Sequence, residues 1–225
     1  MDAVIFDCDG VLIDSETIAH EVELEAMKRL GLFFDGPAYK ARFQGLAVRD
    51  WGAALDADHR AQHGRALPDG FIQGLSAEIT RRVLGDIRPI VGAADAARAF
   101  RGPKAIASSS PKVELHGKIA GLGLTAEFDG HVYSGDDVAR GKPAPDLFLL
   151  AAERLAIEPI RCVVIEDSVN GVKAGIAAGM TVWGFVGGLH CAPDQHERLR
   201  DVGAVRVLNH MREVAAALRA LQTPQ

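Results

Sequence analysis

The stretch AVIFDCDGVLIDSE, residues 3–16, has two carboxylates directly after an apolar run. The four residues of the run, 3–6, are all apolar, which is typical of a strand buried on both faces of a parallel sheet. Asp7 and Asp9 follow two residues apart, and Gly10 comes next. Two carboxylates repel each other by about 4 kcal/mol at a separation of roughly 4 Å and an effective dielectric constant of about 20. Such a pair at the end of a buried strand therefore requires a nearby cation and indicates a chemical purpose.

Similar apolar runs recur along the chain and alternate with helical patterns. The runs predict strands over 104–107, 162–165 and 181–185, with a weaker one over 204–208. Helical patterns fall between them, over 93–101, 112–122, 145–155, 169–178 and 211–221. Alternation of this kind predicts an α/β protein with a doubly wound parallel sheet.

One region, from about Glu16 to Leu84, breaks this alternation because its pattern is helical throughout. Apolar residues recur at helical spacing in its first part, namely Ile18, Val22, Ala26 and Leu30. Asp14 or Ser15 is suited to cap this helix and Gly31 to end it. Further helical stretches cover 48–55 and 70–84. We therefore expect an all-helical cap domain over 16–85, inserted after the first strand of an α/β catalytic core that comprises 1–15 and 86–225.

The bulk composition narrows the class of protein. The chain has 225 residues and a net charge of −5, which argues against a nucleic-acid partner, for which a basic face is expected. No apolar run is long enough to span a bilayer, and a strand that begins at Ala3 predicts that the N-terminus is not a signal peptide. The three cysteines are few and widely spaced, as is typical of a reducing cytosol. We expect a cytoplasmic protein, monomeric or weakly dimeric, with no nucleic-acid or membrane partner.

Polar residues follow several of the predicted strands, and open α/β sheets bind ligands beyond the carboxyl ends of their strands. Four segments send polar groups to that edge, namely the opening pair, Ser108–Ser110, Glu166 with Asp167, and RGKPAPD with Lys142. Four potential negative charges thus meet a single lysine, so a divalent cation is needed to balance them. All candidate ligands are oxygens with no nearby set of Cys and His, which favours Mg²⁺ over Zn²⁺.

The remaining groups at this edge fit a phosphate. Ser108 offers a hydroxyl, Lys142 a cation, and the turn after Asp7 a row of backbone N–H donors that Gly10 allows to approach closely. One carboxylate of the opening pair can then attack phosphorus and form an acyl-phosphate. The other can protonate the leaving oxygen and afterwards activate the water that hydrolyses the intermediate.

Each of these groups also has a purely structural interpretation. Asp and Gly favour turns, so Asp9 and Gly10 alone predict a turn after a strand. Ser108–Ser110 and Glu166–Ser168 both precede helical patterns and are typical of helix caps, and Lys142 alone is typical of a solvated lysine. These interpretations explain single segments, but not four segments that meet at one edge. The glycine-rich loop VGGLHCAPD, 186–194, has no role that the sequence assigns.

Four segments resemble the motifs of the haloacid dehalogenase (HAD) superfamily, in the family's order and over nearly the whole chain. They are FDCDGVLIDSE (6–16), IASSSP (106–111), GKPAPDLF (141–148) and VIEDSVNGVKAGIAAGM (164–180). The helical insert resembles the small cap of the branch that contains β-phosphoglucomutase-like proteins and sugar phosphatases. The resemblance implies a Rossmann-like HAD core with a helical cap.

The resemblance also implies a catalytic and metal-binding set. Asp7 would be the nucleophile and a metal ligand. Asp9 would be the acid/base, with its backbone carbonyl also on Mg²⁺. Asp167 would be a further metal ligand, and Glu166 would hold the metal through water or orient it.

A second set of residues would contact the substrate. The resemblance implies phosphate contacts from Ser108 and Lys142, and Ser109 is a further candidate next to them. In the cap, Gly45 of FQGLAVRD resembles the glycine of the loop that meets the substrate in this branch, which makes Arg49 a candidate substrate contact.

The choice of reaction depends on Asp9 and on the cap loop. Dehalogenases of the family lack an acid at the position of Asp9, so this residue predicts phosphoryl transfer. Phosphomutases of the branch typically carry Ser-Arg shortly after the loop glycine and a histidine on the first cap helix. The loop here reads GLAVR over 45–49, without the serine and with Arg49 displaced by one, and His20 lies one residue from the expected place. We therefore expect a phosphatase of a sugar or polyol phosphate, and RFQG over 42–45 is similar to the 6-phosphogluconate phosphatase type.

Two other functions remain open. The first is a β-phosphoglucomutase-like phosphosugar mutase, which would convert a sugar 1-phosphate to a 6-phosphate instead of releasing free phosphate. The second is a non-enzymatic phosphate sensor on the same scaffold. A sensor needs neither a nucleophile nor an acid/base, and the sequence offers both.

Overall fold

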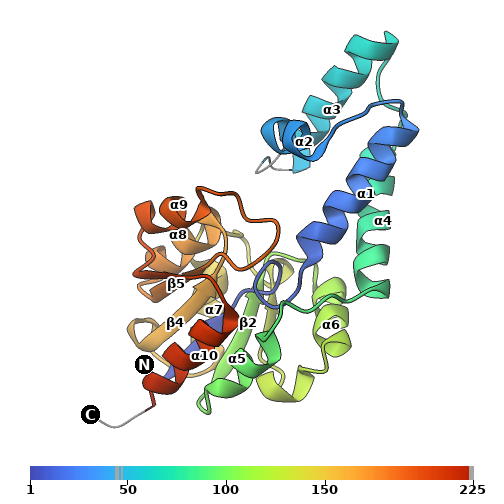
Figure 1. The fold of residues 1–225 in the computed structure, drawn as a ribbon. Helices are drawn as coiled ribbons and strands as arrows, with labels where there is room; N and C mark the ends of the chain where they lie inside the picture. Colours follow the sequence, from blue (N-terminus) through green and yellow to red (C-terminus); the bar gives the residue numbers. More distant parts are fainter. Residues whose placement is uncertain (44–45, 47, 223–225) are drawn as a thin grey trace. The chain divides into compact units, whose positions relative to one another are not determined.

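Figure 1 shows the fold of the protein as a computed structural model, which describes residues 1–43, 46 and 48–222. The chain divides into two compact units. The first, called the core below, comprises Met1–Glu16 and Asp86–Gln225. The second, called the helical unit, comprises Thr17–Gly85.

The core contains a six-stranded parallel sheet in the order β3-β2-β1-β4-β5-β6 (Figure 1). Its strands are β1 (Ala3–Phe6), β2 (Lys104–Ser108), β3 (Val132–Ser134), β4 (Cys162–Glu166), β5 (Thr181–Phe185) and β6 (Arg206–Leu208). Every strand that an apolar run predicted is present, and the doubly wound α/β fold is confirmed. β3 was not predicted, because its three residues, VYS, are too few to form an apolar run.

Helices cover both faces of this sheet, because alternate residues of each strand point to opposite faces. On one face, α5 (Ala93–Ala99), α6 (Lys112–Gly121) and α10 (Met211–Ala220) pack with Val4 and Phe6 of β1. On the other, α7 (Asp146–Arg154), α8 (Val169–Ala177) and α9 (Gln195–Asp201) pack with Ala3 and Ile5. Burial on both faces explains why β1 is apolar at each position. α9 was not predicted, since Leu199 is its single buried residue and gives no helical period.

The pairing of β1 with both of its neighbours sets the position of the opening carboxylates. Phe6 pairs with Ile106 of β2 and Ile165 of β4, and the Asp7 N–H donates to the Ile165 carbonyl at 2.9 Å. Ser108 and Glu166 are the last residues of β2 and β4. Asp7 therefore lies at the carboxyl edge between them, where the strand order reverses and open α/β sheets bind their ligands.

The helical unit has an apolar core of its own. Its elements are α1 (Ser15–Arg29, which begins in the core), α2 (Gly36–Phe43), α3 (Val48–His63) and α4 (Phe71–Gly85). Ile18, Val22 and Ala26 of α1 are buried, as their helical spacing predicts. The Phe43 ring packs against Trp51, with 5.6 Å between ring centroids. In the described part of this unit, the regular elements are helices, in agreement with the helical pattern of the sequence.

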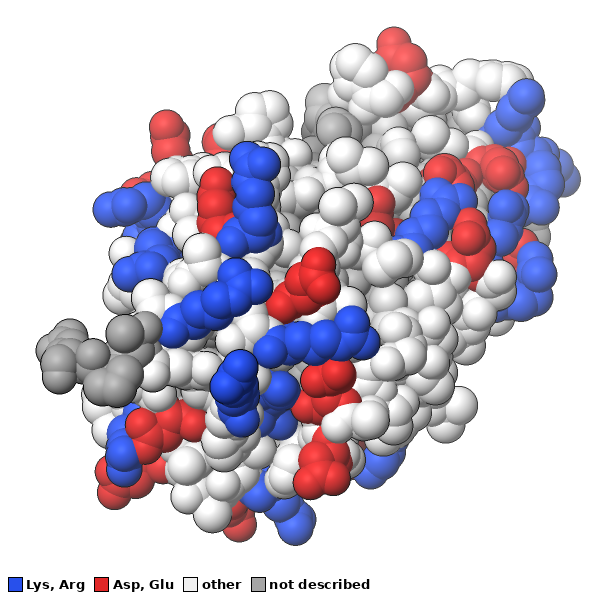
Figure 2. All heavy atoms as spheres, turned by 60° about the horizontal axis from the view of Figure 1, so that its bottom comes forward, with Lys and Arg blue, Asp and Glu red and all other residues white. Residues whose placement is uncertain are grey.

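Charges of both signs lie on the surface of the protein. On the face drawn in Figure 2, Lys and Arg side chains are interspersed with Asp and Glu, which agrees with the small net charge of −5. Among residues 1–43, 46 and 48–222, none of the helices combines the length and apolar character needed to cross a membrane.

Candidate active site

Three carboxylates from the ends of β1 and β4 form a compact cluster. Asp7, Glu166 and Asp167 each contribute an oxygen, and these oxygens lie within 4.8 Å of one another. All three side chains are buried. The sequence predicted that Asp7 and Asp167 meet at this edge, and the structure brings them together.

Lys142 supplies a positive charge to this cluster. Its Nζ lies 2.7 Å from Asp7 Oδ1 and 2.8 Å from Glu166 Oε1, and it also donates to the Ala107 carbonyl at 2.9 Å. The ammonium lies 4.9 Å from the centre of the Phe148 ring. The Lys142 side chain is only 5 % exposed, so the structure excludes the interpretation of a solvated lysine.

The electrostatics of the cluster favour a bound cation. Burial raises the pKa of Asp7 well above its ordinary value. The Lys142 ammonium lowers this pKa, and repulsion by Glu166, Asp167 and Asp9 raises it, but the net shift is upward. Burial also raises the pKa of Asp167 to about 6. Protonation disfavours metal binding, and a divalent cation would supply the missing charge instead. The donors are carboxylate oxygens, which fit Mg²⁺.

Glu166 is oriented by contacts at both of its oxygens. Oε1 accepts from Lys142, and Oε2 accepts from the N–H of Ser168 at 2.7 Å and from its hydroxyl at 2.9 Å. The same Ser168 hydroxyl caps α8 by accepting from Gly171 N–H at 3.0 Å. The segment Glu166–Ser168 therefore caps α8 and also contributes carboxylates to the cluster, so the two interpretations are compatible. A side chain on Gly171 would overlap the Glu166 carboxylate, so glycine leaves room for it.

Gly171→Ala is expected to destabilise the protein, because its Cβ would occupy the place of the Glu166 carboxylate. Overpacking of this kind costs about 1–3 kcal/mol. Gly74→Ala in α4 is the matched control, since nothing lies within 4 Å of its added Cβ, and alanine should stabilise that helix by about 0.5–1 kcal/mol. Urea unfolding of both variants measures the difference. Equal stabilities for the two would contradict the packing argument.

Asp9 lies in a different environment from Asp7. Its carboxylate accepts four side-chain hydrogen bonds: at Oδ1 from Ser15 (2.6 Å) and Lys118 (2.7 Å), and at Oδ2 from Ser110 (2.6 Å) and Ser108 (3.2 Å). Among the described residues, the carboxylate cluster does not include the Asp9 side chain. Burial raises the pKa of Asp9, but Lys118 and the hydroxyl donors outweigh it and hold the pKa below its ordinary value. The two carboxylates of the opening pair are thus held differently.

Of the three serines at the end of β2 and after it, Ser108 and Ser110 contact Asp9, whereas Ser109 lies at the surface. Ser108 is 1 % exposed, and its hydroxyl accepts from the Ser110 N–H at 3.1 Å while donating to Asp9. Ser110 contacts Asp9 and Lys118, and its carbonyl accepts from the Ser134 hydroxyl. Ser109 is exposed. The structure therefore brings Ser108 next to the opening pair and adds Ser110, which the sequence did not single out.

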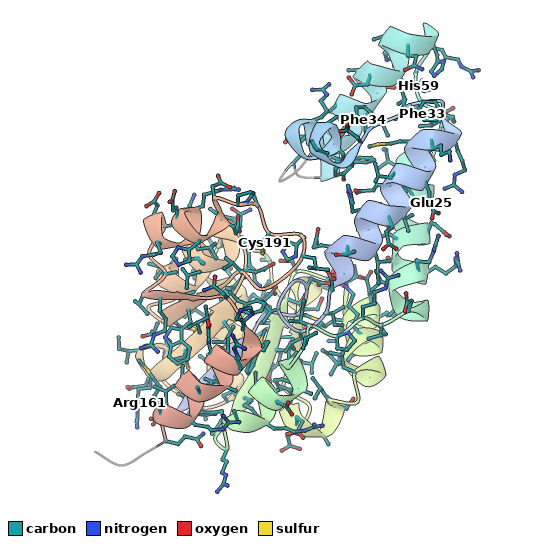
Figure 3. All side chains as sticks on the ribbon, in the orientation of Figure 1. Glu25, Phe33, Phe34, His59, Arg161 and Cys191 are labelled. Atoms are coloured by element: carbon teal, nitrogen blue, oxygen red, sulfur yellow. The ribbon has the colours of Figure 1, made fainter. Side chains whose placement is uncertain are left out.

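The loop after β5, which had no predicted role, belongs to this site. His190 Nε2 lies 2.8 Å from Asp167 Oδ2, and the Gln195 amide donates to the Asp167 carbonyl at 2.6 Å. Burial lowers the pKa of His190, but the hydrogen bonds and charge interactions with Asp167 and Cys191 together outweigh it and raise the pKa to about 11. Figure 3 labels the next residue, Cys191, in this loop. The loop thus places a second positive charge beside the carboxylates.

Two predicted substrate contacts, Arg49 and Gly45, fall within the residue range of the helical unit. The Arg49 side chain is 91 % exposed, and its Nε lies 3.2 Å from Asp50 Oδ1. Gly45 lies outside the described residues. Arg49 and Gly45 therefore stay predictions.

Four residues that contact the site carboxylates were not predicted as site residues, namely Ser15, Ser110, Lys118 and His190. For Lys118 a signal existed: the helix predicted over 112–122 carries it between Leu115 and Ile119, at the spacing of buried positions. A lysine inside an apolar stripe indicates a buried partner for its charge. His190 had no comparable signal, because its loop has no period.

The chain is similar to known proteins over most of its length. A family model described as haloacid dehalogenase-like hydrolase matches residues 1–179. The chain is 28 % identical to a 6-phosphogluconate phosphatase of Escherichia coli (strain K12), over 88 % of this chain and 89 % of that protein. It is 31 % identical to a phosphorylated carbohydrates phosphatase of Thermotoga maritima, over 95 % and 100 %. A HAD family hydrolase from Deinococcus radiodurans R1, solved with bound phosphate and sodium, matches with a TM-score of 0.85 and 39 % identity over 100 % and 99 % of the two chains.

Proposed function

Since the chain belongs to the haloacid dehalogenase-like hydrolases, we propose that it is a Mg²⁺-dependent phosphatase of a small sugar or polyol phosphate that forms an aspartyl-phosphate on Asp7. One observation carries this proposal: the buried Lys142 ammonium bridges Asp7 and Glu166 within a cluster of three carboxylates. The relatives named as 6-phosphogluconate phosphatase and phosphorylated carbohydrates phosphatase support a sugar phosphate as the substrate class.

Binding of the phosphate group uses residues at the ends of β1 and β2 and Lys142 from the segment before α7. Lys142 attracts the phosphate oxygens, and the Ser108 hydroxyl, which donates to Asp9 in the structure, turns to donate to them when substrate binds. The N–H groups of residues 10–13 donate to carbonyls within their own turn, so they are not phosphate donors in this arrangement. Ser109, Gly45 and Arg49 are further candidates for substrate contact. These groups orient the phosphorus atom towards the Asp7 carboxylate, and this positioning is itself a large part of catalysis.

The reaction proceeds in two displacements. A carboxylate oxygen of Asp7 forms a bond to phosphorus while the bond from phosphorus to the sugar oxygen breaks, and the leaving oxygen takes a proton from Asp9. Asp9 then takes a proton from water, and the water oxygen bonds to phosphorus. The bond from phosphorus to Asp7 breaks, which releases inorganic phosphate and restores the free carboxylate.

The metal fits the donors that this site offers. Asp7, Asp167 and the backbone carbonyl of Asp9 would hold Mg²⁺, and Glu166 would hold it through water or orient it. When bound, Mg²⁺ supplies positive charge that stabilises the phosphoryl oxygens and lowers the repulsion between Asp7 and the phosphate. His190 Nε2 lies within hydrogen-bond distance of Asp167 Oδ2, and this contact would orient Asp167 as a ligand.

The test is a screen of phosphorylated sugars, polyols and nucleotides for release of free phosphate. We expect release from sugar or polyol phosphates in the presence of Mg²⁺, its loss when EDTA removes the metal, and its recovery when excess Mg²⁺ is added. EDTA with matching excess Mg²⁺ from the start is the control for effects of the chelator alone.

Other results would favour the alternatives. Conversion of a sugar 1-phosphate to a 6-phosphate, stimulated by a sugar bisphosphate and without free phosphate, would indicate a phosphomutase. Binding of phosphate without turnover of any substrate would indicate a sensor. Full turnover in EDTA would contradict the metal dependence. We further propose a cytoplasmic enzyme, monomeric or weakly dimeric, that acts on a small molecule and has no nucleic-acid or membrane partner.

A further inference from the structure

Lys118 is a buried lysine of α6 that the proposed reaction does not use. Its side chain is 3 % exposed, whereas lysines are almost never fully buried unless they are paired. It lies between Leu115 and Ile119, on the face of α6 that packs in the core. An apolar residue at this position would avoid the cost of burying a charge, so the lysine requires a specific reason.

The Lys118 ammonium has as many acceptors around it as it has N–H donors. Its Nζ lies 2.7 Å from Asp9 Oδ1, 2.9 Å from Ser110 Oγ and 2.5 Å from Glu114 Oε1. Ser110 in turn donates to Asp9 Oδ2 at 2.6 Å. Lys118, Ser110 and Asp9 therefore form a closed ring of hydrogen bonds that holds both oxygens of the Asp9 carboxylate.

We propose that Lys118 is a positioning residue, which fixes the orientation of the Asp9 carboxylate for proton transfer to the leaving oxygen and from the attacking water. A carboxylate held at both oxygens rotates only when hydrogen bonds at both are broken. Glu114 binds the same ammonium and so holds it in place. This inference rests on the proposed function, because Asp9 needs a fixed orientation only if it transfers protons.

The distribution of the two buried lysines supports this assignment. Lys142 contacts Asp7 and Glu166, and Lys118 contacts Asp9 and Glu114. Each carboxylate of the opening pair thus has its own ammonium, in each case at 2.7 Å. The two neighbouring carboxylates therefore lie in separate environments, and the one around Asp9 is built by Lys118.

Lys118→Met tests the proposal, because methionine keeps the length and the apolar stem but removes the ammonium. The measurement is the rate of leaving-group release in a single turnover with Mg²⁺. One substrate is the sugar phosphate with the highest turnover in the phosphate-release screen, and the other is p-nitrophenyl phosphate, whose leaving group departs without protonation. We expect release to be roughly 10²–10³-fold slower with the sugar phosphate, and less than about 10-fold slower with p-nitrophenyl phosphate.

Two comparisons separate positioning from a merely structural role. Lys104→Met removes another largely buried ammonium, which donates to the Phe100 carbonyl at 2.8 Å and lies at the opposite end of β2 from Ser108. It should lower stability without changing the ratio of the two rates. In an Asp9→Asn background, Lys118→Met should slow the sugar phosphate no further, because residues that act as a unit are not additive.

Several outcomes would overturn the proposal. Equal slowing with both substrates, or additive slowing in the Asp9→Asn background, would indicate a structural role for Lys118, as would unchanged rates. Wild-type protein that turns over neither substrate would overturn the proposed function itself and this inference with it. If Lys118→Met does not fold, Lys118→Gln retains N–H donors without the charge and is measured in the same way.

Discussion

Asp7→Asn is expected to slow phosphate release by roughly 10⁴–10⁶-fold. Asparagine keeps the size and shape of the side chain, but its amide oxygen is a poor nucleophile and does not form the bond to phosphorus. The groups that bind the phosphate remain, so a small residual rate over the uncatalysed reaction is expected. The measurement is kcat for the preferred sugar phosphate with saturating Mg²⁺.

Trapping of the intermediate gives a second measurement on the same variant. After acid quenching during turnover, the wild-type protein should gain one phosphoryl group, located on Asp7 by peptide mass spectrometry, and Asp7→Asn should gain none. Asp146→Asn is the matched control, because it removes only ion-pair contacts with the exposed Arg140 and should leave kcat within about two-fold. Normal turnover by Asp7→Asn would show that the covalent mechanism is wrong.

Thermal unfolding shows whether Asp7→Asn loses activity because it loses the nucleophile or because it fails to fold. Asp7 is buried beside Glu166 and Asp167, and burial together with repulsion raises its pKa. A neutral amide removes that repulsion. The midpoint of thermal unfolding without metal should therefore be no lower for Asp7→Asn than for the wild-type protein, as is common where an active site stores unfavourable charge.

The sequence predicts those site residues that lie at or directly after the carboxyl ends of strands. An apolar run buried on both faces identifies β1 and β4 without knowledge of the fold, and the carboxyl ends of parallel strands meet at one edge. This is why the meeting of Asp7, Glu166 and Asp167 could be expected from their positions after those runs. Lys142 follows no strand, and its motif, not its spacing, indicated its place.

The other elements and site residues depend on tertiary packing, which no local sequence pattern indicates. β3 has three residues, and its pairing with β2, not its own sequence, makes it a strand. His190 reaches Asp167 because the loop after β5 folds back over the strand ends, and glycine at Gly10 leaves room beside that carboxylate. Asp9 was expected to act together with Asp7. The four donors that hold its carboxylate could not be expected as a set, because they come from three separate segments of the chain.

Lys142→Met is expected to lower the free energy of unfolding by about 3–5 kcal/mol, because it leaves two buried carboxylates, Asp7 and Glu166, without their shared ammonium. Loss of this cation from the phosphate site should also slow turnover by roughly 10²–10³-fold. Urea unfolding without metal and the phosphate-release assay measure the two effects. Lys112→Met is the matched control, since its ion pair with Asp137 is exposed and worth no more than about 1 kcal/mol.

A second substitution separates the two roles of Lys142. Glu166→Gln in the Lys142→Met background removes one of the uncompensated charges, so part of the lost stability should return. Activity should not return, because the cation that binds the phosphate is still absent. If Lys142→Met proved as stable as the wild-type protein, the charge balance inferred for the carboxylate cluster would be wrong. If it kept full turnover, Lys142 would be a structural residue and not a phosphate contact.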